Sequence, residues 1–321
     1  MGINTKELEN LRQYAQTDKQ KTRLEAYIKY GTRGKACEAL GITVSSFKKS
    51  IAQIRRNASE SNIPNENGLK IVIIPDTQVR QGVLTNHIDA AARFIVKKRP
   101  NVVIFGGDHY DMPSLSVFNS KKQEEGLRIV DDLKAGNDAI ISFMTIIKQG
   151  IPKHKLPRFI YITGNHCPSV RLKRYIESHP ILEGSLLDKT NEFLESQGFE
   201  VYPFLKIVDV GGIKFSHYFC NPHSLKGSPV GGAIETALKN VGFSFVQFHQ
   251  QTYKYGKFYL GDGSCRIGII AGAFYQHDES YMNIQSNRHW RGIIQLNEVK
   301  DGSGDMVEVS LPYLLKHYGE K

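Results

Sequence analysis

Short apolar runs that end in polar loops are the feature of this sequence that most restricts its fold. Beyond residue 69 each run is only three to six residues long, and stretches of helical character, 87–98 and 126–148, separate the early ones. Buried strands that alternate with helices predict an α/β layered domain. The predicted strands are Lys70–Ile74, Val102–Phe105, Phe159–Ile162, Ile213–Phe215, Phe243–Phe248 and Arg266–Ile270.

The first part of the chain has a different texture. Residues 1–57 are rich in helix formers and contain no proline, and the polar stretch that follows, SESNIPNENG, carries Pro64 and Gly68. Such a stretch buries little surface and is typical of a linker. A chain of 321 residues is also long enough for two domains. We therefore predict a small all-α domain over 1–57, a linker over 58–69 and the α/β domain over 70–321.

Positive charge is concentrated at the N-terminal end. The net charge is +10, and the first 60 residues hold 12 Lys and Arg against 6 Asp and Glu. A local basic excess favours a polyanionic partner such as nucleic acid. A solvated basic face is the alternative that charge alone leaves open.

The cysteines and the apolar runs indicate the compartment. Four cysteines are scattered without a C-x-x-C pair, which favours reduced thiols in a cytoplasmic protein. No apolar run approaches the roughly 20 residues of a membrane span. The N-terminus has no apolar signal segment. We expect a cytoplasmic protein with no membrane partner.

The loops after five predicted strands carry an unusual set of polar residues. The first strand leads into Asp76, the second into Gly-Asp-x-x-Asp, the third into Gly-Asn-His, and two later strands into single histidines. Loops at the carboxyl ends of strands converge at one edge of a sheet. Carboxylates, amide oxygens and imidazoles that meet there can hold divalent metals, and two metals about 4 Å apart can clamp a phosphate.

The order and spacing of these blocks resemble the calcineurin-like metallophosphoesterase family, whose blocks run D-x-H, G-D-x-x-D, G-N-H-[DE], a lone His and G-H-x-H. The resemblance covers about Lys70 to Val299 and is nearest to phage and bacterial members, including the DNA repair exonuclease branch. It implies a layered β-sandwich flanked by helices and a metal-dependent hydrolase. A phage-encoded protein of this kind would work in the cytoplasm of its bacterial host.

The resemblance also assigns roles to the matching residues. Asp108 matches the carboxylate that bridges both metals, and Asp76 matches the first carboxylate of the first metal. His166 matches the histidine that protonates the leaving oxygen, and Asp111 matches an aspartate that orients a neighbour. The remaining ligands of the second metal match Asn165, His217 and His249.

Four positions depart from the family pattern. Gln78 stands at the histidine of D-x-H and Gln251 at the last histidine of G-H-x-H, and both positions belong to the first metal. Phe248 replaces the glycine before His249, and Cys167 replaces the acid after Gly-Asn-His. Because the set for the second metal is complete, the two glutamines indicate concerted remodelling of one site rather than random decay.

The remodelled first site would be made of oxygen ligands. Glutamine can ligate through its amide oxygen, and all-oxygen sites suit Mn²⁺ or Mg²⁺ rather than Zn²⁺. We expect one or two divalent ions; the alternative is a lost first site and an inactive domain. His109 and His277 are weaker candidates for ligands, and we expect them around the site or on the surface. The first-site set is Asp76, Gln78, Asp108 and Gln251.

The segment 21–54 has the plan of a helix-turn-helix. Gly41 is suited to a turn, and Thr43 can cap the next helix, which places Val44, Phe47, Ile51 and Ile54 on one face. This plan resembles the helix-turn-helix arms of resolvase-like and phage DNA-binding proteins. The alternative is any small helical bundle with a glycine turn. We predict DNA contacts, mostly to phosphates, from Ser45, Ser46, Lys48, Lys49 and Arg56.

Together these features predict a metal-dependent phosphodiesterase that acts on DNA and is targeted by its N-terminal arm. Arg171, Lys173 and Arg174 follow the Gly-Asn-His loop and are candidates to hold flanking phosphates, with a solvated helix face as the alternative. A DNA-binding or assembly protein with a vestigial phosphoesterase domain is the second hypothesis. A phosphomonoesterase or protein phosphatase is the third, against which the arm argues. A homo-oligomer or a partner subunit is left open.

Overall fold

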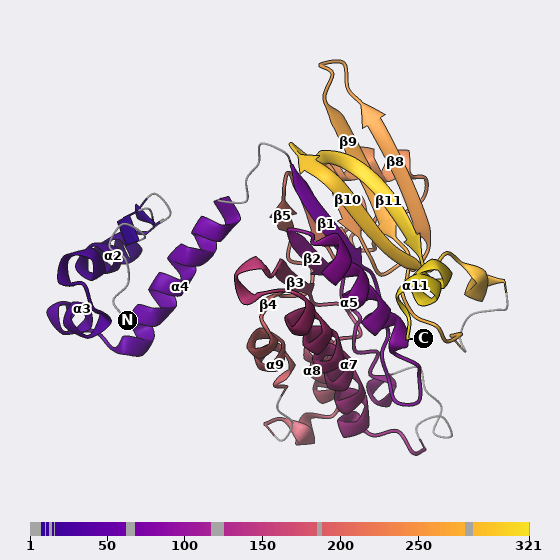
Figure 1. Cartoon of the computed structure of the whole chain (residues 1–321). Helices are drawn as coiled ribbons and strands as arrows, with labels where there is room; N and C mark the ends of the chain where they lie inside the picture. Colours follow the sequence, from indigo (N-terminus) through magenta and orange to yellow (C-terminus); the bar gives the residue numbers. More distant parts are fainter. Residues whose placement is uncertain are drawn as a thin grey trace. The chain divides into compact units, whose positions relative to one another are not determined.

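The computed structural model divides the chain into two compact units, residues 1–67 and 68–321 (Figure 1). The structure describes residues 8–9, 11–12, 15, 17–61, 68–116, 125–184, 188–279 and 285–320. Six of the twelve residues of the predicted linker, 62–67, lie outside the described residues. The side chains of residues 55–61 also lie outside them, including that of the predicted DNA contact Arg56.

Three helices form the described body of the first unit. A capping box begins the first, because Thr17 accepts the Gln20 N–H while the Gln20 side chain accepts the Thr17 N–H. Gly31 and Gly41 end the first two helices in the left-handed conformation. The Thr43 hydroxyl accepts the Ser46 N–H at 3.3 Å, as expected for the cap of the third helix. The helices are α2 (Asp18–Tyr30), α3 (Arg33–Leu40) and α4 (Val44–Ser61).

Helix α4 packs on the others through most, but not all, of its predicted apolar face. Phe47, Ile51 and Ile54 are buried, and the Phe47 ring meets Tyr27 edge-on at 5.4 Å. The prediction for Val44 was wrong: this side chain is 47% exposed. It is the first residue of α4, and a side chain in the first turn of a helix can extend past the packed surface. The buried face therefore begins at Phe47.

A buried arginine joins α2 to α4. Arg23 is 7% exposed, and its guanidinium donates to the Ser46 carbonyl and to the Ser46 hydroxyl, both at 2.9 Å. The fork geometry of a guanidinium suits such paired acceptors. Ser46 is therefore half-buried and engaged within the unit, whereas Ser45, Lys48 and Lys49 are exposed.

The second unit contains a six-stranded sheet in the order β11-β10-β1-β2-β3-β4. Strands β1 to β4 run parallel in this order, and β10 pairs antiparallel with β1 and with β11. The strands are β1 (Leu69–Ile74), β2 (Val102–Phe105), β3 (Arg158–Ile162), β4 (Phe199–Tyr202), β10 (Gly292–Lys300) and β11 (Ser303–Ser310).

A five-stranded sheet follows the order β5-β6-β7-β9-β8. Strands β6, β7 and β9 are parallel neighbours, and β5 and β8 pair antiparallel at the two edges. The strands are β5 (Val208–Val210), β6 (Ile213–Ser216), β7 (Phe245–Gln247), β8 (Tyr253–Tyr259) and β9 (Cys265–Ala271).

Helices cover one face of the larger sheet and form the main core with it. Val72, Val103 and Tyr161 of neighbouring strands pack with Ile95 and Phe143 of the two longest helices of this unit. Helix α10 packs on the smaller sheet in a second core. The helices are α5 (Asn86–Lys98), α7 (Ile129–Gly150), α8 (Pro168–Ser178), α9 (Thr190–Gln197), α10 (Ile234–Val241) and α11 (Leu311–Tyr318).

The predicted α/β class is confirmed, with two mixed sheets and helices around them (Figure 1). All six predicted strands occur within two residues of the predicted bounds. None of the helices in the described part of the chain has the length and apolar character needed to cross a membrane.

Replacing two glycines of the N-terminal arm by alanine should have opposite effects on its stability. Gly41 has φ of +59°, whereas Gly34 lies inside α3, and a methyl group at either position would meet no atom within 4 Å. Gly41→Ala should destabilise the arm by about 1–2 kcal/mol because an L-residue is strained in the left-handed region. Gly34→Ala should stabilise α3 by up to about 1 kcal/mol.

Hydrogen exchange of the α3 and α4 amides in the full chain would measure both effects. Protection should fall in Gly41→Ala and rise or stay constant in Gly34→Ala. Equal protection in the two variants would contradict a left-handed turn at Gly41.

Candidate metal centre

Five loops of the second unit meet at one place because the strands that precede them run parallel within each sheet. β1, β2 and β3 of the larger sheet are parallel, as are β6 and β7 of the smaller one, so each group presents its carboxyl ends together. A short parallel bridge joins Asp76, after β1, to Ala273, after β9, and the Phe274 N–H donates to the Asp76 carbonyl at 2.8 Å. This bridge connects the loop edges of the two sheets.

Asp108 lies at the centre of these loops. Its carboxylate Oδ1 accepts the backbone N–H of His166 at 2.7 Å, and its carbonyl accepts the Gln78 N–H at 2.9 Å. Its φ is +47°, a conformation that non-glycine residues seldom adopt. Gly164 makes the close approach possible, since a Cβ there would lie 2.1 Å from the Asp108 carboxylate.

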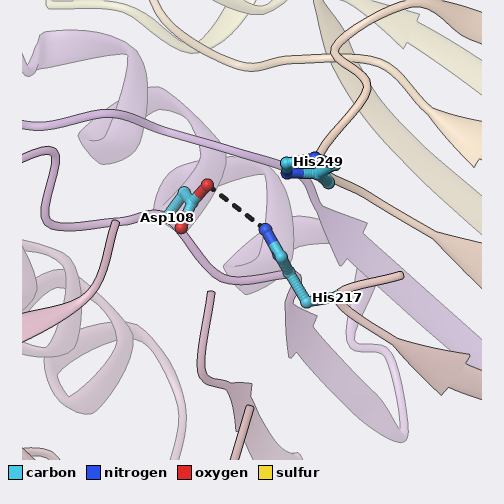
Figure 2. A group of neighbouring side chains, drawn as sticks. All are labelled: Asp108, His217 and His249. Atoms are coloured by element: carbon cyan, nitrogen blue, oxygen red, sulfur yellow. Dashed lines mark ion pairs between the residues drawn. The ribbon is translucent and has the colours of Figure 1, made fainter. Parts of the chain in front are cut away.

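Two histidines and an asparagine surround the Asp108 carboxylate. Ligand atoms of Asp108, His217 and His249 all lie within 4.8 Å of one another, and Figure 2 shows the three side chains together. His217 Nε2 is 3.3 Å from Asp108 Oδ2. The Asn165 amide oxygen is 2.9 Å from His217 Nε2 and 2.7 Å from His249 Nδ1. The four predicted ligands of the second metal are therefore brought together.

The His217 ring is held in an orientation that suits metal binding. Its Nδ1 donates to the Gly106 carbonyl at 2.9 Å, so Nε2 is the nitrogen that faces Asp108. Burial favours the neutral ring, but the Asp108 carboxylate outweighs it and raises the His217 pKa to about 9. Burial and the neighbouring His217 lower the pKa of His249 to about 4.

Buried atoms without partners lie in the loop that carries the first-metal residues. Asp76 Oδ2 and both amide atoms of Gln78 are buried and have no hydrogen-bond partner in the part of the chain that the structure describes. Burial, followed by the charge of Asp108, raises the Asp76 pKa to about 7. Buried polar groups normally find a partner. A divalent cation would satisfy these oxygens, so the residues fit such an ion.

Gln251 has a different arrangement. Its side-chain oxygen accepts a hydrogen bond from the Tyr275 hydroxyl at 2.7 Å, and its own φ is +56°. A backbone hydrogen bond joins the loop of Asp76 and Gln78 to Asp108. Gln251 instead follows β7, and its side chain contacts Tyr275.

His166 belongs to a chain of charged residues beside the metal ligands. Its Nδ1 lies 2.8 Å from Asp111 Oδ1, and Arg80 bonds the other Asp111 oxygen at 2.6 Å. Arg80 also bonds the buried Glu279, which lies 2.8 Å from His277 Nε2. Burial opposes the charged His166 ring, but Asp108 and Asp111 together raise its pKa.

The remaining predicted residues have separate positions. The Arg171 guanidinium donates to the Asp111 and Met112 carbonyls at 2.7 and 2.8 Å, so it supports the Asp108 loop. Lys173 and Arg174 are exposed on α8. His109 bonds the Thr77 hydroxyl at 2.8 Å and the Gly136 carbonyl at 3.0 Å, which agrees with its expected place around the site.

Packing explains the two departures from the family pattern that lie next to the ligands, Phe248 and Cys167. The Phe248 ring fills the space over Gly106, where a Cβ would lie 2.0 Å from it. The buried Cys167 sulfur accepts the Gly164 N–H at 3.2 Å and contacts the Tyr161 hydroxyl at 3.3 Å. Burial, with the charge of Asp108, raises the Cys167 pKa to about 12, so it remains a thiol.

Sequence reasoning missed Arg80, Glu279 and Tyr275. Arg80 lies four residues after Asp76, and its position in the first metal loop is a signal that could have found it. Glu279 contacts it across 199 residues of sequence, and nothing in its local sequence marks that pairing.

Comparison of the chain with protein-family models yields no match, and comparison with curated proteins yields none. Any function assigned to this chain therefore rests on its own residues and their geometry.

The geometry predicts which histidine controls metal affinity. His217→Ala should weaken Mn²⁺ binding by at least about 10- to 100-fold, the loss that even an orienting partner of a ligand causes. His154→Ala is the control, because His154 is exposed and lies on the short helix 153–155. Isothermal titration of the full chain with Mn²⁺ gives the affinity, and circular dichroism checks the fold. Equal affinities in folded variants would contradict the site.

Proposed function

We propose that this protein is a metal-dependent phosphodiesterase that acts on DNA. The observation that carries the proposal is the contact of one amide oxygen, Asn165 Oδ1, with both His217 and His249 beside the Asp108 carboxylate. One carboxylate, one amide oxygen and two imidazoles form a mixed oxygen and nitrogen ligand set that suits a divalent transition metal. A divalent ion held there would supply Lewis-acid polarisation of a phosphate ester.

His166 is suited to the proton transfer that ester cleavage needs. Its Nδ1 is engaged by Asp111, so Nε2 is the ring nitrogen that remains to carry a proton to a departing oxygen. The backbone N–H of His166 donates to Asp108, which fixes the ring next to the ligands. Asp111 and Arg80 hold the ring in orientation, and Asp111 offsets the charge that the ring bears when protonated.

The residues at the predicted first-metal site support a second ion, one that prefers hard oxygen ligands. Asp76 and Gln78 present buried oxygens without partners in the described residues, next to the Asp108 turn. Carboxylate and amide oxygens favour Mn²⁺ or Mg²⁺. Two ions that share Asp108 would follow the pattern that the sequence resembles.

The N-terminal unit supports DNA as the substrate. Helix α4 follows α3 after a short glycine turn and is amphipathic, with Phe47 buried and Ser45, Lys48 and Lys49 exposed. We infer that this pair of helices is a helix-turn-helix and that α4 enters the major groove. Ser46 is engaged by Arg23, so Ser45 is the exposed one of the two serines predicted to contact DNA.

One observation favours the second function, a DNA-binding protein with a vestigial phosphoesterase domain. The Tyr275 hydroxyl donates a hydrogen bond to the side-chain oxygen of Gln251, the residue that stands at a first-metal ligand position. Such a bond competes with metal ligation at that oxygen. The two functions are separated by restoring the imidazoles.

The double variant Gln78→His with Gln251→His should shift metal preference from Mn²⁺ and Mg²⁺ toward Zn²⁺, since imidazole is a softer ligand. If both residues share a metal, the double change should differ from the sum of the single changes by about 0.5–3 kcal/mol. Cleavage of labelled DNA with each metal measures the shift. An inert natural protein and an active double variant would favour the vestigial function.

Exposed lysines of α4 should dominate duplex binding. Lys48→Ala with Lys49→Ala should weaken binding of the full chain to duplex DNA and reduce the salt dependence of log K by up to about 1.8, roughly 0.9 per lost phosphate contact. Lys19→Ala with Lys29→Ala removes the same charge from exposed positions of α2 and is the control. Fluorescence anisotropy at several salt concentrations gives the slope. Equal slopes for both pairs would contradict an α4 interface.

A further inference from the structure

An open groove lies next to the Gly-Asn-His loop. Its volume is about 420 Å³, and it is bounded by the end of β3, by α8, by the start of α9 and by the segment after β4. This volume is in the range of small-ligand sites. Residues that line the groove include Thr163, Ser169, Lys173, Arg174 and Phe204, and the acidic Glu177 also lines it.

An aromatic wall connects the groove to the metal centre. The half-buried Phe204 ring is 5.9 Å from the His217 ring and 5.6 Å from the Tyr218 ring. Tyr218 is in turn 5.0 Å from the His249 ring. A ligand that reached from the metal ligands into the groove would therefore pass along the faces or edges of two aromatic rings.

A buried hydroxyl in the groove has no partner. Thr163 is 3% exposed, and its Oγ1 forms no hydrogen bond with any residue that the structure describes. Thr163 immediately precedes Gly164, Asn165 and His166, so this hydroxyl belongs to the same loop as the metal ligand and the proton donor. Buried hydroxyls normally have a hydrogen-bond partner, and a ligand atom in the groove would supply one to Thr163.

Two cations of α8 supply a charged side to the groove. Lys173 and Arg174 are both exposed, and the nearest acid to Lys173 is Glu177 at 4.0 Å, a weak surface pair. They lie about one and a half turns beyond the start of α8, whose N-terminal turn carries Ser169. The charges are therefore available to a phosphate that lies along the helix.

We propose that this groove binds an unpaired nucleotide next to the phosphate at the metal centre, and that single-stranded DNA is the preferred substrate. The base stacks on Phe204, the backbone contacts Thr163 and Ser169, and Lys173 and Arg174 hold the next phosphate. This inference rests on the proposed function. A base inside a duplex is already stacked on its neighbours, whereas an unpaired base has a free face for an aromatic side chain.

Photocross-linking in the full chain tests the proposal. A short oligonucleotide containing 4-thiothymidine is irradiated with the metal-free protein and an excess of unlabelled duplex, which saturates the N-terminal arm. Cross-linked peptides are mapped by mass spectrometry, and affinity is measured by anisotropy under the same conditions. Attachment to the segment that contains Phe204 or Tyr218 is expected.

Matched variants separate stacking from packing. Phe204→Leu keeps apolar bulk against His217 but removes the flat ring, and should lower the single-strand affinity about tenfold, as loss of one stacked base does. Phe204→Tyr should restore it. Lys173→Ala with Arg174→Ala should also weaken binding, whereas Lys153→Ala with Lys155→Ala, an exposed pair on another helix, should not. Mn²⁺ titration of Phe204→Leu checks that His217 is undisturbed.

The possible outcomes separate the groove assignment from the proposed phosphodiesterase function. Cross-links confined to residues 1–61, or unchanged affinity in Phe204→Leu and in the α8 double variant, would overturn the groove assignment. Equal loss of duplex binding in these variants would overturn the single-strand preference. If the groove cross-links as expected but no metal supports cleavage, the groove stands and the phosphodiesterase function fails.

Discussion

The Asp108 carboxylate and the turn that carries it are the constraint on which the rest of the site depends. One oxygen accepts the His166 N–H, the other lies 3.3 Å from His217, and the carbonyl of the same residue accepts the Gln78 N–H. One residue thus fixes the position of the proposed proton donor, one ligand from the smaller sheet and the start of the remodelled loop. The surrounding loops can approach so closely only because Gly107 and Gly164 lack side chains.

Backbone strain is concentrated around the same turn. Gln78, Asp108, Met112, His249 and Gln251 all have positive φ without being glycine. Each such residue costs on the order of 1–3 kcal/mol and persists only where the surrounding structure enforces it. Here the enforcing structure is the pair of parallel strand groups, whose buried side chains anchor every loop at its start. The sheets therefore hold polar side chains in positions that the loops alone would not adopt.

Sequence reasoning found the elements that carry a strong local signal. The buried strands β1, β2 and β3 are continuous apolar runs, and the loops after them contain the residues that meet at Asp108. The prediction missed β4, β5, β8, β10 and β11. Of these, β11 lies at an exposed edge, which allows a polar sequence, SGDMVEVS, with no apolar run. It also gave Val44 a buried place and could not foresee that Ser46 is engaged by Arg23, since both depend on how α4 packs. The Arg80–Glu279 pair depends on long-range folding and has no local pattern.

The packing of Phe248 on Gly106 links two positions that are far apart in the sequence. A methyl group at residue 106 would lie 2.0 Å from the Phe248 ring, so the ring can be accommodated only while residue 106 remains glycine. In evolutionary terms the two positions form an epistatic pair: the order of substitutions matters, and a larger residue at 106 becomes accessible only after the ring at 248 is lost. Since Gly106 also supplies the carbonyl that orients His217, drift at this pair is coupled to the geometry of a candidate metal ligand.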